Sequence, residues 1–503
     1  MKSPREGTPN RVPSRGFLIR GKMLTGQSRR RTVSKSSRYQ LALIGTMLTC
    51  AILSSAQDPQ KQKLDREYQS AVSDYDGGRY AAAADQLERL LPYAPNSFEI
   101  HELLGLVYAS LSKDTNAEVH LKTAVQLKPD SAIARTNLGT SLLHAGKTAL
   151  AGEQFLKALQ LDSKSFDTNR NLGQYYIQTG KIDEAQPLLE QAQHIKPDSY
   201  DNGYDLAMAD LLLGHLPEAR QAVQNIMTIH DTGELHNLLG QIDEKDGKFL
   251  AAANDFETAA HLDPTEDNLF DWGSEMLLHR TYEPAISIYQ QATTRFPDSP
   301  RLYIGLGLAL YSRGKYDEAV QALLKAADLQ PSDARCYIFL SKAYDSSPKQ
   351  ADDVIRHFHS YAELRPNDAR AQYYYAMSLW KGKRAGDARV DLQTVQGLLQ
   401  QSIALDNTLA EAHVQLGDLY AGQHQYDKSI PEYVRALELN PNLSDAHYRL
   451  GTDYVHVGQK DQAQKEFAVY QKLRAEHLTE SDKERAEVQQ FVYSEKSSSS
   501  SKP

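Results

Sequence analysis

The chain has 503 residues, of which 41% are hydrophobic and 24% are charged, and this composition favours a folded chain over long disorder. Its formal net charge is −9, but residues 1–40 contribute +10 through eleven Lys or Arg and Glu6, so the remainder carries −19. Such an acidic body repels phosphate backbones, which argues against nucleic-acid binding and favours protein or peptide partners, including those with basic segments.

The amino-terminal segment predicts export. Residues 41–53 form an uncharged run, LALIGTMLTCAIL, that follows an arginine triplet at 29–31 and precedes Ser-Ser-Ala at 54–56. The run is shorter than the roughly 20 residues of a spanning helix, and the small residues after it suit signal-peptidase cleavage. We therefore expect an exported protein of the periplasm or cell envelope. The alternative is an uncleaved signal that tethers the chain to the membrane through residues 41–56.

Small residues recur along most of the chain with a period close to 34. They stand at Gly105, Gly139, Gly173, Ala207, Gly240, Gly273, Gly307, Ser341, Ala376, Gly417 and Gly451. A second small residue follows twelve positions later, and a large apolar side chain follows four positions after that, as Ala117 and Leu121 follow Gly105. A fixed period of this length indicates an array of stacked helix pairs.

Close helix crossing accounts for the alternation of small and large side chains. Where two helices cross at a short distance, only Gly, Ala or Ser leaves room, and a large side chain on the adjoining turn fills the groove. We therefore expect helix A, which carries Gly105, to meet helix B at Ala117 and Leu121. A third small site, at Ala124, then lets helix B meet the next helix A.

Glycine and proline mark the expected helix ends. Gly146, Gly180, Gly247 and Gly314 lie between the two helices of a pair, where glycine supplies a left-handed cap. Each proline that ends a helix B is followed within two residues by Asn, Asp, Ser or Thr, which can cap the next helix. These prolines are Pro95, Pro129, Pro197, Pro264, Pro297, Pro331, Pro366 and Pro441.

The combined pattern resembles the tetratricopeptide repeat. Its best copy runs from Leu306-Gly307 through Ala319, Leu323, Ala326 and Pro331. The resemblance implies an all-α fold, a right-handed α-solenoid superhelix of antiparallel helix pairs, with about twelve repeats. It also implies a protein–protein interaction scaffold or adaptor, whose A helices line a concave groove that binds peptide segments or helices of partners. An assembly or export factor for envelope proteins or polysaccharides is the alternative.

Four segments follow from this assignment. Residues 1–56 form the basic leader with its signal peptide or anchor, and residues 64–478 form the solenoid. A capping box at Ser481-x-x-Glu484 predicts a helix over residues 479–494 that covers the end of the stack. The Ser-rich tail, residues 495–503, has no core-forming side chains and is expected to be disordered.

Partner-facing positions on helix A lie two and three residues before the small site and one and four after it. The early repeats place polar side chains there. Asn137 and Asn171 stand at the same position of their repeats, which resembles the asparagine ladder of relatives that bind an extended peptide backbone. A merely solvated polar face is the alternative. The candidates are Thr136, Asn137, Arg170, Asn171 and Gln174, with Asn237 one position out of phase.

The later repeats place rings and cations on or near the same face, a combination that suits an anchor pocket for a peptide or helix. The candidates are Phe270, Tyr311, Arg335, Lys342, Tyr373, Met377 and Trp380. A seven-residue insertion near 384–394 follows, and we expect it to form one docking site with Tyr373 and Trp380. The alternative for each ring is a place in the core.

No catalytic motif is present in the sequence. Asp210 and Asp243 stand where other copies carry tyrosine, and an enzyme that uses this pair is the least favoured function. His357 and His359 are two residues apart on a helix and make a poor metal pair. We therefore predict no catalytic centre, no cofactor and no metal.

Overall fold

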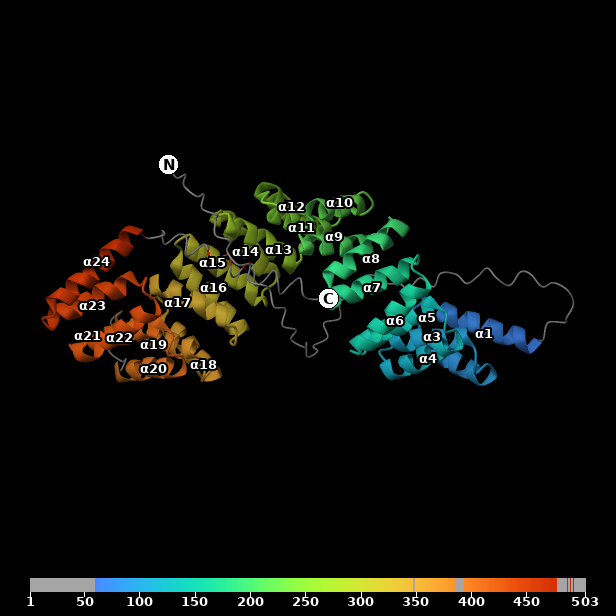
Figure 1. The fold of residues 1–503 in the computed structure, drawn as a ribbon, viewed down its shortest axis with the longest axis horizontal. Helices are drawn as coiled ribbons and strands as arrows, with labels where there is room; N and C mark the ends of the chain where they lie inside the picture. Colours follow the sequence, from blue (N-terminus) through green and yellow to red (C-terminus); the bar gives the residue numbers. More distant parts are fainter. Residues whose placement is uncertain are drawn as a thin grey trace, which may run out of the picture. The chain divides into compact units, whose positions relative to one another are not determined.

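A computed structural model describes the larger part of the chain. The described residues are 59–346, 349–384 and 392–476, together with Ala486, Gln489 and Val492. They contain 24 α-helices and one short 3₁₀ helix, and no strand occurs among them. The chain divides into two compact units, residues 1–69 and 70–503; α1 begins in the first, and every other helix lies in the second. Figure 1 labels the helices in chain order.

The helices alternate between two roles, which we name A for odd numbers and B for even numbers. The A helices are α1 (Pro59–Asp76), α3 (Phe98–Ser110), α5 (Ala132–His144), α7 (Phe166–Gln178), α9 (Tyr200–Leu213), α11 (Gly233–Lys245), α13 (Glu266–Leu278), α15 (Pro300–Ser312), α17 (Ala334–Ser346), α19 (Ala369–Arg384), α21 (Ala410–Gly422) and α23 (Ser444–His456). The B helices are α2 (Tyr80–Leu90), α4 (Asp114–Leu127), α6 (Thr148–Leu161), α8 (Ile182–Ile195), α10 (Leu216–Met227), α12 (Phe249–Leu262), α14 (Tyr282–Arg295), α16 (Tyr316–Leu329), α18 (Ala351–Leu364), α20 (Leu392–Leu405), α22 (Tyr426–Leu439) and α24 (Lys460–Glu476). The 3₁₀ helix η1 (Leu91–Tyr93) follows α2.

Serial packing joins these helices into one array. From α3 onward each A helix packs against the B helix that follows it, and each B helix packs against the next A helix. Successive A helices also contact each other; for example, α5 contacts α7, and α13 contacts α15. Because the turn within a pair is as short as three residues, the two helices of a pair run antiparallel. The predicted all-α helical-repeat solenoid is confirmed.

The periodic glycines lie where a B-helix side chain presses against helix A. A Cβ on Gly105 would lie 2.3 Å from Leu121 Cγ, and one on Gly139 would lie 2.8 Å from the ring of Phe155. Leu121 is completely buried, and so are the small residues on either side of it, Ala117 and Ala124. The close-crossing rule inferred from the sequence is therefore met in the packing.

The helix ends follow the predicted local chemistry. Ser131 caps α5, with its side chain accepting a hydrogen bond from the Ala134 amide, and Ser299 caps α15 in the same way from Leu302. Gly146 between α5 and α6 has φ of 72°, the left-handed conformation that glycine adopts without strain. Each of these caps satisfies backbone groups that a helix end leaves open.

Four predicted segments lie wholly or largely outside the described residues. They are the leader at 1–56, most of the insertion near 384–394, the helix at 479–494 apart from Ala486, Gln489 and Val492, and the tail at 495–503. Helix α19 reaches Arg384 and has 16 residues, against 13 or 14 in the A helices from α3 to α17. In the part of the chain that is described, no helix combines the length and hydropathy needed to cross a bilayer.

Candidate protein-interaction surface

The side of the array formed by the A helices carries a row of polar bridges between repeats. Asn137 Nδ2 donates to Glu102 Oε1 at 3.2 Å, which joins α5 to α3. Gln174 Nε2 donates to Asp205 Oδ2 at 2.8 Å and so joins α7 to α9. We use the name A face for the surface formed by the four partner-facing positions of each A helix, which lie two and three residues before the small site and one and four after it. Its amides link neighbouring repeats as well as facing outward.

The remaining early candidates differ in accessibility. Arg170 lies 3.6 Å from Asp201 of α9 and keeps about a quarter of its side chain exposed. Asn171 donates to the Asp167 carbonyl of its own helix at 2.7 Å. Thr136 is only 5% exposed, and its hydroxyl donates to the Ala132 carbonyl at 2.9 Å. Thr136 is therefore a buried helix residue, and its role as a partner contact stays a prediction.

Carboxylates gather along the A helices between α7 and α13, and one of them, Asp205, stands at an A-face position. Asp201 and Asp205 lie on α9, and Glu234 lies at the start of α11. Burial raises the pKa of Asp205; the Gln174 hydrogen bond and Arg170 oppose the rise, and Asp201 and Glu234 add to it. These acids were not predicted from the sequence, although Asp205 stands two residues before Ala207, at one of the four register positions.

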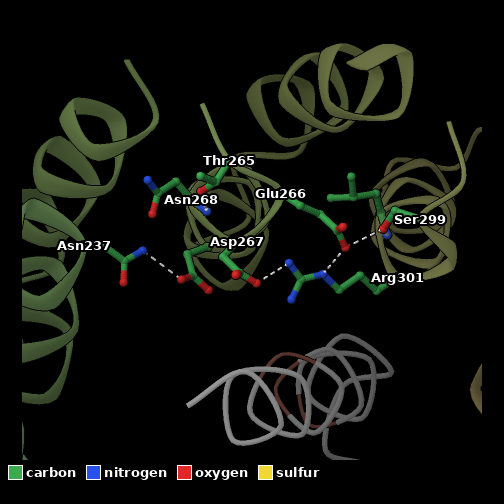
Figure 2. A network of polar contacts seen from close by, with 9 residues as sticks. Asn237, Thr265, Glu266, Asp267, Asn268, Ser299 and Arg301 are labelled. Atoms are coloured by element: carbon green, nitrogen blue, oxygen red, sulfur yellow. Dashed lines mark hydrogen bonds and ion pairs between the residues drawn. The ribbon is translucent and has the colours of Figure 1, made fainter. Parts of the chain in front are cut away.

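A second polar network links α11, α13 and α15 (Figure 2). Asn237 Nδ2 donates to Asp271 Oδ2 of α13 at 2.8 Å. Arg301 of α15 donates from Nε to Glu266 Oε1 at 2.7 Å and from its terminal nitrogen to Asp267 Oδ1 at 2.5 Å. Arg301 was missed from sequence because it stands six residues before Gly307, outside the four register positions.

Two of the later candidates have other roles. Phe270 is 1% exposed, and the guanidinium of Arg301 covers its ring at 4.9 Å from the centroid. Phe270 is a core residue, which was the alternative left open for each ring. Arg335 pairs with Asp333 at the start of its own helix, with Nε 2.9 Å from Oδ1. Its guanidinium is therefore already engaged by a neighbouring carboxylate.

The other later candidates lie on the A face and are half-buried. Tyr311 packs against Tyr316 with ring centroids 5.5 Å apart, and Lys342 lies on α17. Tyr373 and Trp380 of α19 pack against one apolar cluster that includes Tyr420 of α21. The rings of Tyr373 and Trp380 thus share one cluster, whereas the insertion expected beside them lies almost wholly outside the described residues. Met377 stands between them on the same helix and is also half-buried.

Asp210 and Asp243 are both buried, in different surroundings. Both terminal nitrogens of Arg220 donate to the carboxylate of Asp243, one of them at 2.9 Å. Asp210 Oδ1 lies 3.5 Å from Nδ1 of His215, and burial raises the pKa of Asp210. Asp243 is therefore engaged by Arg220, whereas Asp210 lies beside His215.

The histidines of α18 have separate partners. His357 Nε2 lies 2.9 Å from Asp328 Oδ1, whereas His359 Nδ1 lies 3.8 Å from Glu363 Oε2. Within the described ranges, no group of three or more His, Cys, Asp or Glu side chains is arranged to hold a metal ion.

Stacked helix pairs with a polar, carboxylate-rich A face define an α-helical repeat scaffold. Models of the tetratricopeptide repeat match residues 68–122, 115–166 and 279–334, residues 142–200 and 176–242, and residues 410–443. The matched segments together span just over half of the chain, which belongs to the tetratricopeptide repeat family. This fold supports a role as a protein-interaction scaffold.

Solved structures with a similar fold differ widely in sequence. That of pilF from Pseudomonas aeruginosa is 18% identical with a TM-score of 0.38, and the match covers 41% of this chain and 95% of that chain. The Cut9–Hcn1 structure is 15% identical with a TM-score of 0.35, covering 84% and 96%. Yeast Tom70 is 14% identical with a TM-score of 0.34, covering 88% and 97%. No curated protein sequence matches the chain.

Proposed function

We propose that the chain is a non-catalytic scaffold that holds a basic peptide segment of a partner protein on the A face between α7 and α13. The observation that carries this proposal is the desolvated carboxylate of Asp205, which lies in the field of Asp201 and Glu234. Arg170 is the cation that partly balances them. A partner Lys or Arg that enters this field offsets the repulsion that the desolvated Asp205 carboxylate experiences from Asp201 and Glu234.

The bridging amides supply a second kind of contact. Gln174 and Asn237 each donate one amide hydrogen to an acid of the next A helix, and each amide nitrogen carries a second hydrogen. Asn237 Oδ1 already accepts from Gln241 Nε2 at 2.6 Å, so the amide oxygen that a peptide would meet is that of Gln174. These groups suit an extended backbone, which presents alternating donors and acceptors. Positive side chains on such a peptide then face the carboxylates, and amide groups bind its main chain.

Charge reversal on α9 tests this proposal. We expect the full chain with Asp201→Lys and Asp205→Lys to capture its partner from envelope extracts at least about tenfold less well, because each reversal turns attraction into repulsion. Glu153→Lys with Glu184→Lys, two exposed acids on α6 and α8, is the matched control because it changes net charge equally on B helices. Equal losses in both double variants would refute a site on the A face.

The place of action is proposed from the amino-terminal sequence. Residues 41–56 carry the features of an export signal, so we place the scaffold in the periplasm or cell envelope. Amino-terminal sequencing of the mature protein tests this; an intact Met1 would contradict cleavage. An assembly or export factor for envelope proteins or polysaccharides is the second candidate, favoured by the same segment. Recovery of secretion components or polysaccharide synthases with the captured partner would distinguish it from a passive scaffold.

A further inference from the structure

Helices α9 and α13 share a set of side chains that no other A helix from α3 onward carries. Each has an acid six residues before its small site, an aromatic ring three before and an aspartate two before. In α13 these residues are Asp267, Phe270 and Asp271, and in α9 they are Asp201, Tyr204 and Asp205. Because equal register on a helix gives similar side-chain directions, the two sets can be compared position by position.

In α13 this set binds a guanidinium. Arg301, six residues before the small site of α15, lies over the Phe270 ring at 4.9 Å from the centroid. Its Nε donates to Glu266 Oε1 at 2.7 Å, and a terminal nitrogen donates to Asp267 Oδ1 at 2.5 Å (Figure 2). Burial opposes the charge, yet three carboxylates, that of Asp271 included, raise the pKa of Arg301. With 13% of its side chain exposed, Arg301 shows how the set holds an arginine.

The set on α9 meets an acid where the set on α13 meets Arg301. At that position α11 carries Glu234, which is exposed and accepts a hydrogen bond from the Tyr200 hydroxyl at 2.9 Å. Burial raises the pKa of Tyr204, and the nearby carboxylates of Glu234 and Asp205 add to the rise. Tyr204 and Asp205 are half-buried. The ring and its acids are therefore gathered at one place that a side chain from solvent can reach.

Arg170 does not take the place of Arg301 at this set. It belongs to α7, which contacts α9, whereas Arg301 belongs to the A helix that follows its set. Its terminal nitrogen lies 3.6 Å from Asp201 Oδ2, which is longer than a hydrogen bond. In the described part of the chain, no cation lies over the Tyr204 ring. The acids of α9 and α11 thus lack the stacked guanidinium that the acids of α13 have.

We propose that the partner residue held at α9 is an arginine, whose guanidinium lies over the Tyr204 ring and pairs with Asp201 of α9 and Glu234 of α11. The inference rests on the proposed scaffold function and narrows its basic segment to one kind of side chain. A planar guanidinium stacks on a ring while it forks between carboxylates, whereas an ammonium is a compact and strongly hydrated charge. The partner supplies at α9 what Arg301 supplies at α13.

An internal arginine tests this site without a partner. Glu234→Arg gives α11 the residue that α15 has at the same position. We expect hydrogen exchange of the full chain in α9 and α11 to be slower by on the order of tenfold in Glu234→Arg than in Glu234→Lys. Glu234→Lys is the matched control because it makes the same change of charge and loses the same hydrogen bond from Tyr200. Equal exchange in the two variants would overturn the arginine site.

Peptides test the same preference in the native chain. Labelled peptides of alternating Arg and Gly, and of alternating Lys and Gly, have the same spacing and charge. We expect the Arg peptide to bind the wild-type chain at least about tenfold more tightly than the Lys peptide. Tyr204→Leu should abolish this preference, whereas Tyr93→Leu, at an exposed tyrosine of η1, should retain it. Equal binding of the two peptides to wild type, or a preference that survives Tyr204→Leu, would contradict the inference.

The arginine site and the proposed function can fail separately. If the Asp201→Lys and Asp205→Lys chain loses its partner but the two Glu234 variants exchange alike, the arginine site alone is rejected. If the preference for the Arg peptide depends on Tyr204 but the α9 double variant captures its partner normally, the basic-segment scaffold alone is rejected.

Discussion

Tyr289 is held between two glycines, and this arrangement gives a sharp test of the packing. A Cβ on Gly305 of α15 would lie 2.6 Å from two ring atoms of Tyr289, and one on Gly273 of α13 would lie 2.8 Å from the same ring. Tyr289 is completely buried, and its hydroxyl lies 2.9 Å from Ser274 Oγ in a hydrogen bond. The ring is therefore fixed from both sides and cannot move away from a methyl group.

Two opposing terms set the size of the effect of Gly305→Ala. Overpacking a filled core costs about 1–3 kcal/mol. Replacing glycine by alanine within a helix contributes about 0.5–1 kcal/mol in the opposite sense. With the ring unable to relax, we expect a net loss of roughly 1–2 kcal/mol in the free energy of unfolding. The loss should be concentrated in α13, α14 and α15, because each repeat contacts only its neighbours.

Gly397 provides the matched control. It lies in the interior of α20, and a Cβ there would meet no atom within 4 Å, so Gly397→Ala should stabilise the chain by up to about 1 kcal/mol. Urea unfolding followed by circular dichroism gives the overall change, and hydrogen exchange locates it. If Gly305→Ala matched Gly397→Ala in sign and size, the close contact between Gly305 and Tyr289 would not exist in solution.

Three further predictions concern buried ionisable groups. Arg220→Met should lower the unfolding free energy by about 3 kcal/mol because Asp243 keeps a buried charge without its partner. In urea unfolding, the double variant Arg220→Met with Asp243→Asn should recover part of this loss. Full stability of the single variant would contradict the ion pair. Burial and the neighbouring His101 lower the pKa of His120 from 6.5, so the unfolded chain binds a proton first as pH falls. The urea midpoint of the wild-type chain should therefore fall when the pH drops below about 6.5, and that of His120→Gln should fall less. Burial raises the pKa of Asp453 from 3.8, so the protonated carboxyl stabilises the fold and this stabilisation is lost as pH rises through the folded pKa. Asp453→Asn should therefore raise the melting temperature at neutral pH. A lower melting temperature would show that the charge is needed.

The helix array was predictable because its determinants are local or periodic. A cap such as Ser131 acts on the backbone within one turn, and the contact of Gly139 with Phe155 of the next helix recurs with the 34-residue period. Each copy thus supports the assignment of the others. The left-handed turn at Gly146 follows from the same local rule.

The interaction surface was predictable only in part. Register indicates which way a side chain leaves helix A, but it does not show what covers that side chain, and so the burial of Thr136 and Phe270 did not follow from the sequence. The pairing of Gln174 with Asp205 joins residues 31 positions apart and depends on the spacing of two helices, which the sequence pattern does not give.

The two halves of the A face differ in what they can tolerate in the absence of a partner. Between α7 and α11 the polar pairs, such as Arg170 with Asp201, are partly exposed. Each pair of this kind stabilises a fold by about 0–1 kcal/mol. A basic peptide can therefore replace such contacts at little cost in free energy. Between α13 and α15 the corresponding side chains are apolar, and Ile304 and Leu308 are buried. If they were exposed, they would form an apolar patch that favours association with other chains. Under the proposed function, a partner therefore exchanges contacts with the polar half, whereas Ile304 and Leu308 remain in the core. These apolar side chains belong to the core cluster that joins α13 and α15 to α14 and α16, so the fold itself keeps them from water.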